Sequence, residues 1–200
     1  MKHGRRLITS VICTAAFLGL AGAAHASDCP DADLPTTSAT TLQISNATLC
    51  LLNEQRAAAG VPTLKLETPL GRIARRYGRD MVTQHFFSHV SPSGETLADR
   101  IATLDYQLDA AGENLAMAGG TTVTPAAIVA AWMNSSGHRE NILDRDYKKV
   151  GIGAATDAGD QDHGASTAFV AEFGTPHAKP RHRARAAHRR AVARTAITRR

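Results

Sequence analysis

Acidic residues are confined to one segment of this 200-residue chain, and that segment limits where a folded domain can form. All 18 aspartates and glutamates lie within residues 27–176, together with 11 of the 23 lysines and arginines, which gives the segment a net charge of −7. Residues 177–200 carry nine positive charges and no acid. Because this tail is also poor in large apolar side chains, it cannot bury a core, and we expect it to be disordered. The sequence therefore predicts a single domain over residues 43–176.

Residues 1–26 have the features of a secretory signal peptide. Three basic residues precede an uncharged apolar run over 7–24, and the run ends in the small-residue cleavage site Ala24-His25-Ala26. A membrane anchor is the alternative, but the run is short for a span and rich in alanine and glycine. No later segment is long and apolar enough to cross a bilayer. We expect a secreted or periplasmic protein with no transmembrane segment once the leader is removed.

Two cysteines remain after the leader, Cys29 and Cys50. An even number of cysteines in an oxidising compartment predicts one disulfide, and two buried free thiols are the alternative. The bridge would close a loop of about 20 residues and contribute roughly 3 kcal/mol by the chain-entropy estimate. It would attach an irregular arm over residues 27–42, which is rich in Pro, Thr, Ser and Asp, to the first helix.

Apolar periodicity predicts helices early, an antiparallel hairpin late and further helices between them. The clearest helix begins at Thr68-Pro69, since proline is favoured at a first helical position, and it carries a core-facing stripe to Met81. The other predicted elements are a helix from Ser45 or Asn46 to Ala59, a short helix over 97–104, an extended segment over 112–117, a helix from Thr124-Pro125 through Trp132, and strands over 150–156 and 166–173. This order indicates an α+β fold in which helices cover a small sheet.

Titratable residues stand beside glycine or serine in three short motifs. FFSHV places His89 at the end of the long helix, AGENLA contains Glu113, and SSGHREN contains His138. Two imidazoles and a carboxylate brought together could bind a divalent cation such as zinc. Taken singly, each residue is more typical of a helix cap or a turn. There is no G-x-S-x-G motif, and Phe86 stands where a zinc protease of the H-E-x-x-H type needs glutamate.

Several ordered blocks resemble the CAP superfamily of cysteine-rich secretory, antigen-five and pathogenesis-related proteins, and in particular its bacterial SCP-like extracellular branch. The blocks are LLNEQRAAAGVPTLKLETPL, HFFSHVSPSGETLADRI, GENLA, and VAAWMNSSGHRENIL followed by VGIG. The resemblance covers roughly residues 45–175. It implies an α-β-α sandwich, in which helices flank a small antiparallel sheet, and a cleft centred on two histidines and two acidic residues.

The resemblance assigns roles to particular residues. His89 and His138 match the two histidines of the family, and Glu113 matches the glutamate of its G-E-N motif. The second acid of the family falls at Ser135, so the family's four residues are reduced to three. Two imidazoles and one carboxylate could still hold zinc with water in the fourth position. We expect weaker metal affinity and no pair of carboxylates for acid-base chemistry.

Three further polar residues, Asn114, Ser135 and Asn141, are assigned supporting roles beside the cleft. Asn114 and Asn141 also match the motifs, and their amides are expected to bond the backbone or orient the histidines beside the cleft. Arg100 could bind an anion, but we expect it to pair with Asp99 instead.

The tail and the resemblance together suggest a protein of the cell envelope. Nucleic acid is the usual partner of such a basic run, but export makes it an unlikely one here. Anionic envelope polymers or lipid head groups could bind residues 177–200, or the tail could solubilise the chain or fold back on its acidic domain. We expect an exported binding module whose His/Glu cleft takes a divalent metal, and we favour binding over catalysis. A metal-assisted hydrolase acting on peptides or envelope polymers is the alternative, and a purely structural triad is a third possibility.

Overall fold

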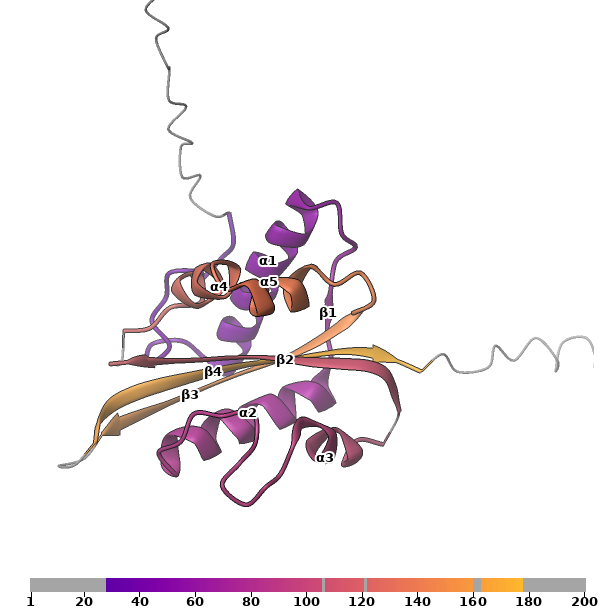
Figure 1. Ribbon diagram of the computed structural model, residues 1–200. Helices are drawn as coiled ribbons and strands as arrows, with labels where there is room; N and C mark the ends of the chain where they lie inside the picture. The colour runs from indigo at the N-terminus through magenta and orange to yellow at the C-terminus, as the bar shows by residue number, and fades with distance from the viewer. Residues whose placement is uncertain (1–27, 106, 121, 160–162, 178–200) are drawn as a thin grey trace, which may run out of the picture.

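A four-stranded sheet separates two layers of helices (Figure 1). The computed structural model describes residues 28–105, 107–120, 122–159 and 163–177. Its helices are α1 (Thr41–Ala58), α2 (Thr68–Thr83), α3 (Leu97–Ala102), α4 (Pro125–Met133) and α5 (Ser136–Leu143). Helices α1, α4 and α5 cover one face of the sheet, and α2 and α3 cover the other. The predicted α+β class and α-β-α layering are therefore confirmed.

The sheet places one long strand at its edge. The strands are β1 (Lys65–Leu66), β2 (Leu108–Gly119), β3 (Lys149–Gly159) and β4 (Gly164–Pro176), in the order β1-β3-β4-β2. Strand β4 pairs antiparallel with both β2 and β3, while the short β1 pairs parallel with β3, so the sheet is mixed and not wholly antiparallel as the resemblance implied. Because successive side chains of β2 alternate between the two faces of the sheet, residues from both helical layers can contact it.

Apolar side chains fill both spaces between the sheet and the helices. On one face, Trp132 and Phe169 are buried in the larger cluster with residues of α1, and Trp132 is a core residue as predicted. On the other face, Tyr77 and Met81 of α2 pack against β2 and β4. A Cβ atom added at Gly151 would overlap the backbone of α2. The absence of a side chain there allows α2 to lie directly on β3.

A buried arginine ties α1 to the segment that follows α5. Arg56 is fully buried, and its guanidinium donates to four backbone carbonyl oxygens. The acceptors are Pro62 (2.7 Å), Ile142 (2.7 Å), Asp144 (2.9 Å) and Tyr147 (3.1 Å). Burial lowers the pKa of Arg56, and the nearby charge of Asp144 opposes that shift. These bonds supply acceptors for every nitrogen of a charge that would otherwise be costly to bury.

Two helix boundaries differ from the sequence-based expectation. Helix α1 begins at Thr41, four residues before Ser45, because Thr40 and Gln43 form a reciprocal capping box. Helix α2 ends at Thr83, so the expectation that His89 stands at its end is wrong. His85 has a φ of 52°, a left-handed conformation that cannot continue a helix, and His89 lies farther along the same loop.

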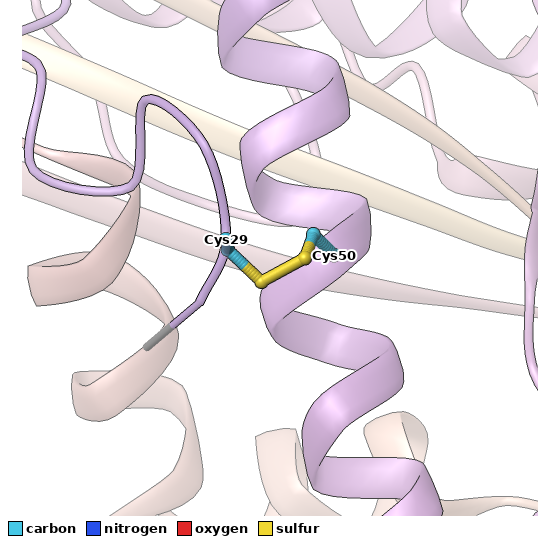
Figure 2. The surroundings of a disulfide bond; sticks show 2 residues. All are labelled: Cys29 and Cys50. Atoms are coloured by element: carbon cyan, nitrogen blue, oxygen red, sulfur yellow. A yellow bond between two sulfur atoms is a disulfide. The ribbon is translucent and has the colours of Figure 1, made fainter. Parts of the chain in front are cut away.

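The predicted disulfide is present between Cys29 and Cys50, 21 positions apart (Figure 2). It joins the irregular arm to the middle of α1. The arm is also held by backbone hydrogen bonds, from Thr36 N–H to the Val123 carbonyl at 2.9 Å and from Ala126 N–H to the Ala32 carbonyl at 2.9 Å. The N-terminal arm is thereby fixed against α1 and α4.

Two expectations from the sequence lie outside the described residues: the signal peptide over 1–26, and the disordered tail from residue 178 onward. Within the described part of the chain, no helix is both long enough and apolar enough to cross a membrane.

Candidate functional site

His89 and Glu113 are in direct contact at the edge of the sheet. His89 lies in the loop between α2 and α3, and its Nδ1 is 2.6 Å from Oε1 of Glu113 on β2. The loop is held in place because the Tyr77 hydroxyl donates to the Ser88 carbonyl at 2.6 Å. The His89 side chain is 60% exposed, whereas that of Glu113 is 2% exposed. The structure therefore joins a solvent-facing imidazole to a buried carboxyl group.

Arg100 of α3 binds the other oxygen of the same carboxylate. Its Nη2 donates to Oε2 of Glu113 at 2.5 Å, and both side chains are buried. The guanidinium carbon lies 3.5 Å from the centroid of the Tyr77 ring, a cation–π contact. The expected pairing of Arg100 with Asp99 is wrong, since the Asp99 carboxylate closes a capping box with Thr96 at the start of α3. Arg100 instead supplies the charge that balances Glu113.

A second carboxyl group lies beside this pair. Glu172 of β4 stands opposite Glu113 in the strand register, and its side chain is fully buried. Its Oε1 is 3.8 Å from Nε of Arg100, too far for a hydrogen bond. Burial raises the pKa of Glu172 well above its usual 4.5, and the charge of Glu113 adds to that effect, while Arg100 opposes it. When Glu172 is protonated, the buried charges are those of Arg100 and Glu113, which balance each other. This arrangement has a lower desolvation cost than one with two buried carboxylates and a single arginine.

His138 reaches the same region from the other helical layer. It is the third residue of α5, for which Ser135 is the N-cap residue, although the Ser135 side chain makes no capping hydrogen bond. Successive side chains of β2 point to opposite faces, so Asn114 faces α5 and donates from Nδ2 to the His138 carbonyl at 3.0 Å. Asn141 donates to the Asn114 side chain at 2.9 Å and to the Glu113 carbonyl at 3.2 Å. The two amides thus fasten α5 to β2.

Protonation states follow from these contacts. An ionised carboxylate can only accept, so Nδ1 of a neutral His89 carries the proton that bonds Glu113, and its Nε2 keeps a free lone pair. His138 is half-buried, and burial, followed by the charge of His89, lowers its pKa. Near neutral pH the site therefore presents two imidazoles, of which at least His138 is uncharged.

The three residues do not form a ready metal site. In the described ranges, the group of three whose ligand atoms all lie within 4.8 Å of one another is Cys29, Cys50 and Glu54, and its sulfurs are bonded to each other. Both carboxylate oxygens of Glu113 are already engaged, Oε1 with His89 and Oε2 with Arg100. The two imidazoles are thus better suited than Glu113 to contact a cation, and the three-ligand metal site stays a prediction.

The chain is thus a small α-β-α sandwich domain, and its polar site at the edge of the sheet contains His89, His138 and the buried Glu113. The model of the CAP family, described as the cysteine-rich secretory protein family, matches residues 49–173. Since this match covers well over half of the chain, the protein belongs to the CAP family.

Two curated relatives are proteins of Bacillus subtilis. The chain is 35% identical to the uncharacterized protein YkwD of Bacillus subtilis (strain 168) over 103 residues, which is 52% of this chain and 39% of that protein. It is 35% identical over 105 residues to the uncharacterized membrane protein YlbC of the same strain, covering 52% of this chain and 30% of that protein. The chain thus aligns with well under half the length of these two relatives.

Two solved structures share the fold. One is an extracellular protein containing an SCP domain from Bacillus anthracis str. Ames, with 26% identity and a TM-score of 0.52, covering 68% of this chain and 44% of that one. The other is an outer surface protein from Borrelia burgdorferi, with 25% identity and a TM-score of 0.51, covering 63% of this chain and 87% of that one.

Proposed function

We propose that this chain is an exported CAP-domain protein that binds a component of the cell envelope through the His89 site. The observation that carries the proposal is the contact between the exposed imidazole of His89 and the buried Glu113. A side chain with 60% exposure is ordinarily free to rotate, but this one is oriented by a carboxylate that Arg100 in turn holds. Such support for an exposed polar group is typical of a binding site and has no evident value for packing alone.

Export is supported from two sides. Residues 1–26 have the pattern of a signal peptide, and the disulfide suits an oxidising compartment. The names of the two solved relatives describe one as extracellular and the other as an outer surface protein. The second of the Bacillus relatives is named a membrane protein, which agrees with a place in the cell envelope for this chain. Together these observations favour a secreted or periplasmic location.

The chemistry of the site suggests what the ligand offers. With Nδ1 of His89 bonded to Glu113, its Nε2 is the ring nitrogen that remains for a ligand, and the neutral imidazole of His138 can accept or donate a hydrogen bond. No buried net charge remains to attract a strongly charged group. Hydroxyl or amide groups, which abound in envelope polymers, therefore suit this site best.

Binding to isolated envelope material tests the proposal. We expect His89→Gln to weaken cosedimentation at least tenfold, because glutamine cannot reproduce the oriented Nε2. His85→Gln is the matched control, as His85 is an exposed histidine of the same loop that stacks on His163 and has no contact with Glu113. Equal retention of the wild type and both variants would refute the assignment of the ligand site to His89.

The basic tail is a second, separate route to the envelope. We expect its nine positive charges to bind anionic polymers or lipid head groups in a salt-dependent way, with nucleic acid an unlikely partner after export. Retention on anionic vesicles should fall when residues 178–200 are deleted or when salt is raised to about 0.5 M. Unchanged retention after deletion would refute this route without affecting the site at His89.

A metal-assisted hydrolase is the second candidate, favoured by the orientation of His89. A histidine that binds a metal through one ring nitrogen commonly donates a hydrogen bond from the N–H of the other to a carboxylate. The Nδ1 of His89 contacts Glu113 in this way and leaves Nε2 for a metal. His89 and His138 would hold a zinc ion, and a bound zinc supplies a polarised water. Calorimetric titration with zinc, repeated on His138→Ala, tests this candidate. If the wild type takes up no zinc, or hydrolysis of peptide and glycan substrates is insensitive to chelator, the metal-assisted function is wrong.

A further inference from the structure

A groove lies between α3 and the beginning of β2, separate from the residues of the His89 site. Its volume is about 980 Å³, and its eleven lining residues belong to α3, to the segment that follows it and to the first four residues of β2. Apolar side chains form its floor, namely Leu97, Ile101, Leu104 and Leu108. Two exposed carboxylates, Asp105 and Asp109, also line it. The groove thus combines an apolar floor with negative charge.

The last described residue of the chain is bound to the wall of this groove. The ladder between β4 and β2 ends with Pro176 opposite Leu108, and the His177 N–H then donates to the Gln107 carbonyl at 2.9 Å. The His177 ring approaches Asp109, with Nδ1 2.6 Å from Oδ1. Gln107 and Asp109 both line the groove. In Figure 1 the end of β4 accordingly lies at the same end of the sandwich as α3.

We propose that residues 178–200 of this chain bind in the groove between α3 and β2 of the same molecule. The tail has nine positive charges and no acid, whereas the domain has a net charge of −7. The chain passes from the domain into the tail beside the exposed aspartates of the groove, Asp105 and Asp109. Its arginines can place their aliphatic stems on the leucine floor and their guanidinium groups on Asp105 and Asp109. Its 23 residues reach up to roughly 75 Å when extended, which is ample for a groove that begins at residue 177.

Tethering strengthens this contact without any additional interaction. Because the tail begins at the groove wall, its effective concentration there is in the millimolar range, and weak contacts suffice for occupancy. Anionic polymers that bind the tail would have to displace it from the groove. The groove contact does not depend on what binds at His89.

Methyl NMR of two exported proteins, the full chain and a variant that ends at His177, tests the proposal. We expect the methyl signals of Leu97 and Ile101 to shift on truncation. In the full chain, raising the salt to about 0.5 M should move them toward the truncated positions, because screening weakens the ionic contacts. Asp105→Asn should shift them in the same direction. Asp33→Asn, which removes an exposed charge from the N-terminal arm, should not.

Three results would overturn the proposal. Truncation could move only signals beside the cut, at residues 107–109 and 175–177, and leave Leu97 and Ile101 unchanged. The shifts could instead appear on α1 or α4, which would place the tail on the other helical layer. They could also grow with protein concentration, which would mean that the tail binds another molecule.

Discussion

Replacing Glu172 with glutamine should make the protein more stable at neutral pH. Burial and the neighbouring Glu113 raise the pKa of Glu172 in the folded state well above 4.5, so the folded protein keeps a proton that the unfolded chain releases. The stability that this proton supports is complete below pH 4.5 and is lost as the pH rises toward the folded-state pKa. The loss for one such group is up to about 1.4 kcal/mol per pH unit. Glutamine cannot ionise and avoids this loss.

Urea unfolding from about pH 4 to about pH 8, followed by the fluorescence of Trp132, measures the difference. Trp132 is the only tryptophan of the chain and is buried, so its emission reports on global unfolding. We expect nearly equal free energies of unfolding for the wild type and Glu172→Gln at the acidic end of the range. The variant should then gain an advantage that grows with pH until Glu172 ionises in the folded wild type. Two curves that remain parallel over the whole range would show that Glu172 is not protonated in the folded protein.

Three further predictions concern the framework that holds the site. Arg56→Met leaves four carbonyl oxygens without donors and should cost about 4 kcal/mol or more in urea unfolding, whereas Arg145→Met, which removes one exposed bond to a carbonyl, should change little. If the two arginine variants unfold alike, the network is not stabilising. Reduction of the disulfide should lower the free energy of unfolding by about 3 kcal/mol for its sequence separation of 21, and an unchanged urea midpoint would contradict this. Gly151→Ala should cost about 2 kcal/mol by forcing α2 away from β3, while Gly137→Ala, where an added Cβ meets no atom within 4 Å, should not destabilise.

The fold could be predicted where the signal is local. The start of α4 at Thr124-Pro125 and the stripe along α2 follow from capping and periodicity, which depend only on neighbouring residues. Ser45 has the side chain of a typical cap residue and so predicts a later start for α1 than the structure shows. Inside the helix, however, its hydroxyl bonds the Thr41 carbonyl at 2.9 Å. The parallel pairing of β1 with β3 could not be predicted, since it joins Lys65 to Lys149, far apart along the chain.

The roles of Arg100 and Glu172, which are buried beside Glu113, could not be predicted from residue types alone. Arg100 belongs to a helix of six residues, too short for periodicity to show which face is buried. Glu172 interrupts the apolar run AFVAEFG, and a single acid in such a run is a signal for a buried charge that needs a partner. The partner itself depends on strand register, which places Glu172 opposite Glu113 of a strand that is distant in the sequence.

The position of Glu172 also bears on the choice between binding and hydrolysis. Ser135 stands where the family resemblance would place a second acid, and the structure has a second carboxyl close to Glu113 after all. Yet the Glu172 side chain has no exposed surface, so no ligand can contact it. Its raised pKa suits it to neutralise a crowded buried cluster and not to donate a proton to a substrate. The surface of the site therefore offers the imidazole of His89, which Glu113 holds, and the imidazole of His138, and this favours binding over hydrolysis by a pair of carboxylates.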